Sequence, residues 1–349
     1  MICERVQRMF EDFYGNSTAA EVLGQMVSGS RIPQTILLAG PDGIGKATLA
    51  RRFGARLLGH GPAIEKDDLS LPHNVDLLAE REKMPADKRG DDPLLFQSNP
   101  DFVTFCPEGP LRQISIQQMR VLKDRAQFAP LKGRHRVFLI DQIDRANEQA
   151  ANSLLKILEE PPPYLIILCT ASNPYDLLPT IRSRSVPLYL SRLTPEEMDA
   201  FVALRGLDQA KRRIALAAGS PGAAVSLDLP IYDKRRAAML ALLGAAAGVL
   251  PWADWAKQSE ALNAARSEKL ENYLKVLYLL LEDLLWIRYY PDAPLKNFDI
   301  RRELEGLSRV IEFEWIRKAV RKTDELIDLL RRNIQRGIAL DAWVLELRR

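Results

Sequence analysis

The chain has 349 residues, of which 47% are hydrophobic and 27% charged, and its formal net charge is +3. This composition excludes collagen-like, disordered and membrane-spanning chains, because apolar residues suffice for a core and no charge-free apolar run is long enough to cross a bilayer. The near balance of charges does not by itself indicate a nucleic-acid-binding protein. At roughly 150 residues per domain, the length predicts about two to three domains.

The cysteines and the N-terminal segment bear on metal binding and compartment. The cysteines are scattered, and no two of them have the two-residue spacing of a structural zinc site. The first residues carry acidic side chains and lack the apolar core of a signal peptide. We therefore expect a cytoplasmic protein with no membrane segment and no metal site. The cysteines are Cys3, Cys106 and Cys169.

Strand and helix patterns alternate in the first half of the chain. Thr35–Ala39 is an apolar run typical of a strand, and a helical stretch begins at Ala47 after a glycine-rich turn. Apolar runs at Arg136–Ile140 and Tyr164–Thr170 predict further strands, with a helix at Asn147–Leu158 between them. This alternation predicts an α/β domain with a parallel sheet covered on both faces.

One segment interrupts this domain, which we place at residues 1–190. Gly59–Pro100 is rich in Asp, Lys, Pro and Glu and has no sustained hydrophobic period. We predict an insertion at about residues 59–100 that is partly flexible.

Helical patterns dominate after the third strand. Thr194, followed by Pro195 and then an acid at the capping-box position, marks a helix start and predicts a small helical lid at residues 191–228. An all-α domain is predicted at residues 229–349. Its helix at Tyr273–Tyr290 contains charged residues, which favours the core of a helical bundle over a membrane span.

The glycine-rich turn has the pattern of a phosphate-binding loop. In such loops the glycines let backbone N–H groups converge on phosphate oxygens, and a lysine, here Lys46, neutralises the outer phosphates of ATP or ADP. The next residue, which usually supplies a hydroxyl to magnesium, is Ala47. Thr48 is rotated by about 100° on a helix and is a poor substitute. The loop glycines are Gly40, Gly43 and Gly45.

Two polar residues at predicted strand ends are further nucleotide-site candidates. Asp141 resembles the acid that holds magnesium, but Gln142 stands where a carboxylate often orients water, which predicts slow hydrolysis. The alternative is that Asp141 merely ends a buried strand. Asn173 is suited to sensing a γ-phosphate and equally to forming a turn before a proline, and both interpretations stay open.

Basic residues suggest two more sites. Arg182 and Arg184 lie beside small hydroxyl residues, and either a phosphate-contacting arginine finger or a solvated basic turn explains them. Leu111–Arg136 contains seven basic residues and one acid, a local charge of +6. This segment is either a surface for nucleic-acid phosphates or a solvated helix face.

Taken together, these motifs resemble the bacterial clamp loader of DNA polymerase III. The resemblance extends over nearly the whole chain and implies an AAA+ module, a small helical lid and a helical collar. The matching segments are Gly40–Lys46, Arg136–Asp144, Ala150–Pro162 and Arg182–Ser185, with weaker support from Arg332–Ile334 and Leu340–Trp343.

Departures from the family pattern favour a delta-prime type of subunit over a gamma/tau motor. Ala47 and Gln142 replace two parts of the hydrolysis machinery, and Gly222 stands where motors carry the sensing arginine of the lid. Arg184 is present at the position of the arginine finger. In the family this arginine acts on the nucleotide of a neighbouring subunit. Family members usually carry four cysteines after the first helix, and because the insertion contains none we carry over no zinc.

The resemblance also implies partners. We expect gamma/tau and delta subunits in a hetero-pentamer, with contacts to the sliding clamp and primer-template DNA made through the complex. Binding of ATP or ADP without turnover stays open because Lys46 is intact. The alternatives are a gamma/tau-like ATPase motor and a nucleotide kinase, which would not need the helical C-terminal third.

Overall fold

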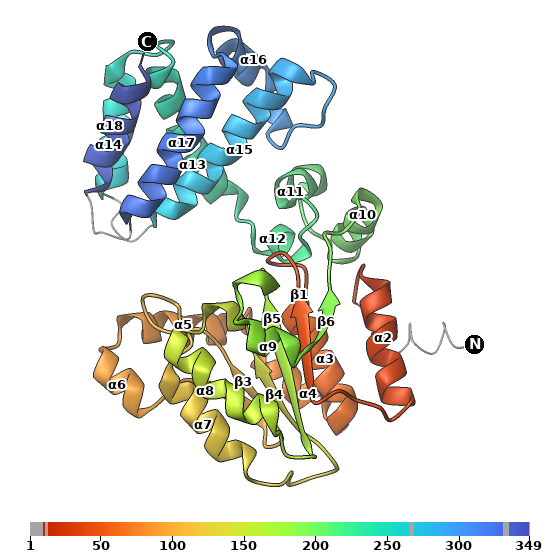
Figure 1. The fold of residues 1–349 in the computed structure, drawn as a ribbon. Helices are drawn as coiled ribbons and strands as arrows, with labels where there is room; N and C mark the ends of the chain where they lie inside the picture. The colour runs from red at the N-terminus through yellow and green to blue at the C-terminus, as the bar shows by residue number, and fades with distance from the viewer. Residues whose placement is uncertain (1–9, 11–12, 265–268, 331–334, 349) are drawn as a thin grey trace. The chain divides into compact units, whose positions relative to one another are not determined.

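The computed structural model describes residue 10 and residues 13–264, 269–330 and 335–348 (Figure 1). The chain forms two compact units. The first contains Met1–Phe201 and Gly219–Gly222, and the second contains Val202–Ala218 and Ala223–Arg349. The division into three parts drawn from the sequence stays a prediction.

The described part of the first unit contains a six-stranded sheet in the order β2-β3-β4-β5-β1-β6. Neighbouring strands pair in parallel except β2 and β3, which are antiparallel. The predicted parallel sheet is therefore confirmed, with an antiparallel edge strand added. The strands are β1 (Thr35–Ala39), β2 (Leu95–Asn99), β3 (Phe102–Phe105), β4 (Arg136–Ile140), β5 (Leu165–Ala171) and β6 (Val186–Tyr189).

Helices cover both faces of the sheet. Because alternate residues of a strand face opposite sides, Ile36 and Leu38 pack against α2 and α3, whereas Leu37 packs in the cluster formed with α7 and α8. Figure 1 shows α2 and α8 on opposite sides of the strands. These elements are α2 (Ser17–Ser28), α3 (Lys46–Leu58), α7 (Ile116–Ala126), η3 (Ile143–Arg145), α8 (Glu148–Glu159), η4 (Pro174–Asp176) and α9 (Pro179–Ser183).

The segment predicted as an insertion contains short helices and the edge strand β2. Buried Asp67 accepts a hydrogen bond from the backbone N–H of Ser98 at 2.9 Å, which joins the start of the segment to its end. The helices are α4 (Gly61–Ile64), η2 (Glu65–Asp67), α5 (Pro72–Lys83) and α6 (Ala86–Asp91). Three of these helices have six residues or fewer, and the longer α5 buries the polar residues Asn74 and Arg81 instead of an apolar stripe, so the sequence shows no sustained hydrophobic period.

The helix start predicted at Thr194 is confirmed. The backbone N–H of Glu197 donates to the Thr194 hydroxyl at 3.2 Å, and the Glu197 carboxylate accepts from the Thr194 N–H at 2.9 Å. These reciprocal bonds form a capping box. The helices that follow are α10 (Pro195–Leu204), α11 (Ala210–Ala217) and α12 (Pro221–Ser226).

The C-terminal region is helical, as predicted. Trp255, Leu277 and Trp343 lie in one buried apolar cluster that joins its helices. Of the weaker family matches, Leu340–Trp343 lies in α18 and Arg332–Ile334 lies outside the described residues. The elements are α13 (Leu229–Ala246), α14 (Trp252–Ala264), α15 (Leu270–Tyr289), η5 (Phe298–Ile300), α16 (Arg301–Val310), α17 (Phe313–Leu330) and α18 (Arg336–Leu347).

Helix α15, which has 20 residues, is not a membrane span. Its acid Asp283 is fully buried and accepts hydrogen bonds from the backbone N–H groups of Lys296 and Asn297, each at 2.8 Å. Nowhere in the described residues is a helix long and apolar enough to cross a membrane.

Candidate functional site

The predicted phosphate loop connects β1 to α3, the required strand-to-helix context. Gly40 has φ 149° and a Cβ there would lie 2.1 Å from the Leu190 carbonyl oxygen, so no side chain fits. Gly45 has φ 92° and caps α3 without a side-chain hydrogen bond to the first turn. The first N–H groups of a helix lack intrahelical partners and attract anions, and here they adjoin the loop.

Lys46 lies across this loop, with only 7% of its surface exposed. Its amine donates to the carbonyl oxygens of Gly40 at 2.6 Å and Pro41 at 2.8 Å. Burial lowers the pKa of Lys46, while the charges of Asp42, Asp141 and one further acid act to raise it. A bound phosphate would have to replace the two carbonyl contacts of the amine.

Asp141 lies directly after β4 and is held by a residue that the motifs did not identify. Its carboxylate accepts a hydrogen bond from the Thr170 hydroxyl at 2.6 Å, and that hydroxyl accepts from the Gln142 N–H at 2.8 Å. Burial raises the pKa of Asp141 above its ordinary value, although the Thr170 hydrogen bond and the charges of Arg51 and Lys46 oppose this rise. In the sequence, the feature that could have pointed to this role of Thr170 is its hydroxyl near the end of an otherwise apolar strand.

A second acid, Asp144, also lies near the loop. Its carboxylate accepts from the Ser172 N–H at 2.9 Å, and the Ser172 hydroxyl donates to Asp42. The other carboxylate oxygen of Asp144 is buried without a hydrogen-bond partner in the described structure. With Ala47 in place of the hydroxyl residue and Asp141 bonded to Thr170, the residues do not fit the usual magnesium site of a phosphate loop.

Asn173 and Thr48 complete the set of predicted nucleotide contacts. The Asn173 side chain is exposed, accepts from the Tyr175 N–H at 3.1 Å and donates to Asp176 at 3.0 Å. These bonds cap η4 and are those of the turn-forming alternative. Thr48 lies half-buried on α3, one residue beyond Ala47. A role of either residue with nucleotide stays a prediction.

Gly219–Gly222 lies directly on the phosphate loop. The Ser220 hydroxyl donates to the Asp42 carbonyl at 3.1 Å, and the Gly222 N–H donates to the Gly43 carbonyl at 2.8 Å. A Cβ on Gly222 would lie 2.9 Å from that carbonyl oxygen and 3.0 Å from the Gly43 Cα. There is thus no room for any side chain where the family resemblance expects a sensing arginine in motors.

Gly222→Ala should therefore lower the free energy of unfolding of the first unit by about 1–3 kcal/mol, the usual cost of overpacking. Helix propensity alone would favour alanine by about 1 kcal/mol. Urea unfolding should be followed by circular dichroism, because the five tryptophans all lie in the second unit. Gly90→Ala is the control, since a Cβ there meets nothing closer than 4.0 Å. Equal stability of the two variants would contradict the close contact.

Arg184 follows α9, and its guanidinium is engaged within the chain. It donates to the Glu159 carboxylate at 2.8 Å and to the Thr180 carbonyl at 3.1 Å, and the side chain is 35% exposed. Arg182 instead lies over the Tyr175 ring at 5.2 Å. The two arginines of the predicted finger motif therefore have different surroundings.

The basic segment Leu111–Arg136 presents fewer charges than its sequence suggests. Arg136 is buried and donates to the Phe128 carbonyl at 2.9 Å, and Arg112 is paired with Glu82 at 2.7 Å. Arg120, Lys132 and Arg134 are exposed. The proposed contact of this segment with nucleic acid stays a prediction.

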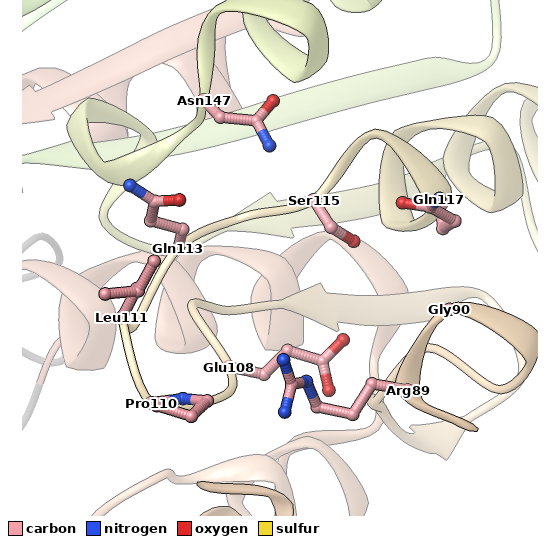
Figure 2. Close-up of a pocket in the computed structure, with 9 residues that line it drawn as sticks. All are labelled: Arg89, Gly90, Glu108, Pro110, Leu111, Gln113, Ser115, Gln117 and Asn147. Atoms are coloured by element: carbon pink, nitrogen blue, oxygen red, sulfur yellow. The ribbon is translucent and has the colours of Figure 1, made fainter. Parts of the chain in front are cut away.

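A cavity of about 420 Å³ lies beside the start of this segment, and its lining residues are drawn in Figure 2. Ser115 and Asn147, two of its polar lining residues, are the N-caps of α7 and α8. Glu108 and Arg89 lie at the opposite side from Asn147 in this view. The lining residues include none of the nucleotide contacts predicted from the sequence.

The cysteines form no metal centre in the described structure. Cys106 and Cys169 are buried and unbonded, and burial raises the pKa of Cys169 to about 12, which disfavours the thiolate that zinc binds. The described residues contain no group of three or more His, Cys, Asp or Glu able to hold a metal ion. Cys3 lies outside the described residues, and the absence of zinc stays a prediction.

Comparison with known proteins finds one matching family and several relatives. The sequence model of a family described as DNA polymerase III, delta subunit, matches residues 15–194, more than half of the 349 residues. DNA polymerase III subunit gamma/tau of Mycobacterium bovis is 29% identical over 205 residues, which cover 54% of this chain and 31% of that protein. DNA polymerase III subunit delta' of Pseudomonas aeruginosa is 32% identical over 198 residues, which cover 53% of this chain and 52% of that protein.

Among solved structures, a DNA polymerase III gamma subunit-related protein from Thermotoga maritima matches with a TM-score of 0.48 and 18% identity. The match covers 93% of this chain and 98% of that chain.

Proposed function

Because the chain belongs to the DNA polymerase III clamp-loader family that the delta-subunit model describes, we propose that it is a delta-prime-like subunit of a bacterial clamp loader. In this role it turns over little ATP of its own. It lends Arg184 to the ATP site of a neighbouring gamma/tau subunit while the sliding clamp is loaded onto primer-template DNA. Its proposed partners are the gamma/tau and delta subunits of a hetero-pentamer.

The observation that carries this proposal is the contact between Gly222 and the phosphate loop. A lid arginine that responds to the γ-phosphate needs space over the loop, and the Gly43 backbone occupies that space. Ala47 and Gln142 stand where a motor has the hydroxyl that binds magnesium and the carboxylate that orients water, two further groups that act on a subunit's own nucleotide. Arg184, in contrast, is a group used on a neighbour's nucleotide, and it is present on an exposed turn.

Nucleotide binding without turnover is compatible with this role. The glycines and Lys46 of the loop are those that hold phosphates, so ATP or ADP can occupy it if the amine gives up its contacts with Gly40 and Pro41. The missing carboxylate at Gln142 lowers hydrolysis, since a positioned general base contributes about 10²–10⁴-fold.

ATP turnover by the purified chain tests the proposal. We expect a rate about 10²–10⁴-fold below that of a clamp-loader motor, with no further loss in Lys46→Ala. Binding of a fluorescent ADP analogue, measured on the same two proteins, reports occupancy of the loop separately. Turnover at the rate of a motor, abolished by Lys46→Ala, would instead identify a gamma/tau-like ATPase. Phosphoryl transfer to a small acceptor would identify a nucleotide kinase.

A further inference from the structure

The ion pair between Arg184 and Glu159 joins two elements of the first unit that are each fixed by packing. Glu159 is the last residue of α8, whose preceding residue Leu158 is buried. Arg184 directly follows α9, where Ile181 is 1% exposed and accepts a hydrogen bond from the Ser185 hydroxyl at 2.8 Å. The backbone on both sides of the pair is therefore held in place, and the two side chains meet at 2.8 Å.

The position of Glu159 is unfavourable for the helix that carries it. A carboxylate at the C-terminal end of a helix is repelled by the negative end of the helix dipole. Glu160, the next residue, adds a second negative charge at the same end of α8. Helix stability thus does not account for an acid at position 159, whereas contact with Arg184 does.

We propose that Glu159 is a positioning residue for Arg184, an inference that rests on the arginine-finger function proposed above. An arginine side chain has many rotamers. Fixing the orientation of its planar, fork-shaped guanidinium before the phosphate arrives reduces the side-chain entropy that is lost when the transition state forms. Glu159 and the Thr180 carbonyl bind two of the five N–H donors of the guanidinium. The other donors of the fork are left for a phosphate oxygen of the neighbouring subunit.

The strength of the pair suits this role. Glu159 is 48% exposed and Arg184 is 35% exposed, and ion pairs so close to solvent contribute little to stability. The pair can therefore bias the orientation of the fork and still let it adjust when a phosphate binds. A fully buried pair would hold the guanidinium too firmly to change partners.

The test replaces Glu159 in the complete clamp loader. Glu159→Ala should lower the kcat of the DNA- and clamp-stimulated ATPase by about 3- to 5-fold, with the KM for ATP unchanged, because the fork is needed in the transition state. Glu159→Gln keeps an oxygen at the same place and should restore most of the rate. Glu160→Ala removes the neighbouring acid of the same helix end and should have no effect.

A second readout needs no nucleotide. In the isolated chain, the ¹⁵N relaxation of the Arg184 Nε–H group should indicate an ordered side chain in the unaltered protein, in Glu159→Gln and in Glu160→Ala. Glu159→Ala should shift it towards a freely rotating side chain. Equal order in all four proteins would overturn the positioning role, and Glu159→Gln keeps the test available if the alanine variant folds poorly.

The outcomes separate this inference from the function on which it rests. If Arg184→Ala leaves the ATPase unchanged, the finger function itself is wrong. If Arg184→Ala lowers the rate but Glu159→Ala does not, or raises it, Glu159 is a bystander or a competitor and only the positioning role is overturned. Adding Glu159→Ala to Arg184→Ala should cause no further loss, since the two residues act as one unit.

Discussion

Arg184→Ala should lower ATP hydrolysis at the neighbouring site by about 10³-fold or more in the assembled clamp loader, the range of arginine fingers supplied in trans. The guanidinium neutralises charge that develops on the transferred phosphoryl group, and alanine cannot replace it. The measured loss for the whole complex will be smaller, because the other ATP sites continue to turn over. Steady-state ATPase with saturating clamp and DNA, at fixed salt, gives the comparison.

Arg182→Ala is the matched control for this prediction. Arg182 lies two residues away on the same turn, but its guanidinium stacks on Tyr175 instead of pairing with Glu159. We expect a much smaller loss of activity, and size-exclusion chromatography should show intact assemblies for both variants. If both substitutions lower the ATPase rate equally, or neither lowers it, Arg184 is better explained as part of a solvated basic turn.

Arg81→Met should destabilise the first unit by about 3–5 kcal/mol, the effect of leaving one charge of a buried ion pair without its partner. Arg81 donates to the Glu108 carboxylate at 2.8 Å, and the two side chains are 8% and 4% exposed. This pair anchors α5 to the chain that follows β3. Methionine fills a similar volume, so the loss reflects the unpaired Glu108 charge more than a cavity.

Arg112→Met is the control for the buried pair. Arg112 also forms an ion pair, with Glu82 at 2.7 Å, but its side chain is 59% exposed. Its replacement should change the free energy of unfolding by at most about 1 kcal/mol. Both variants should be measured by urea unfolding with circular dichroism, and similar losses for the two would show that burial of the Arg81 pair is not what stabilises this segment.

The sequence predicts the centre of the sheet better than its edges. The strands Thr35–Ala39 and Arg136–Ile140 have the predicted bounds, and the third differs by one residue at each end. Buried parallel strands are continuously apolar and therefore easy to recognise. The strands β2, β3 and β6 were not predicted. Three of the five residues of β2, Gln97–Asn99, are polar, β3 and β6 have only four residues, and β6 contains Pro187.

Some residues of the candidate site could also be predicted from the sequence, and others could not. Gly40–Lys46 and Asp141 are found from motifs, because backbone geometry and phosphate charge restrict which residues can occupy them. Thr170 and Glu159 have no such restriction. Their roles depend on partners 29 and 25 residues away, Asp141 and Arg184, which only the paired strands and packed helices bring close.

The contact of Gly222 with the phosphate loop shows why local pattern is not enough. The Ser220 hydroxyl reaches the Asp42 carbonyl across 178 residues of sequence. Family resemblance could say that an arginine is missing at position 222, but not that the loop backbone occupies its place. That fact follows from the close approach of Gly219–Gly222 to the phosphate loop within the first unit.

The most direct test of the account compares two variants of this chain in otherwise identical clamp loaders. Single-turnover ATP hydrolysis is measured for assemblies that contain the unaltered chain, Lys46→Ala or Arg184→Ala. A subunit that serves its neighbour and does not hydrolyse ATP itself predicts near-normal turnover with Lys46→Ala and a severe loss at one site with Arg184→Ala. The reverse result, in which Lys46→Ala removes turnover and Arg184→Ala does not, would contradict the account and identify the chain as a motor.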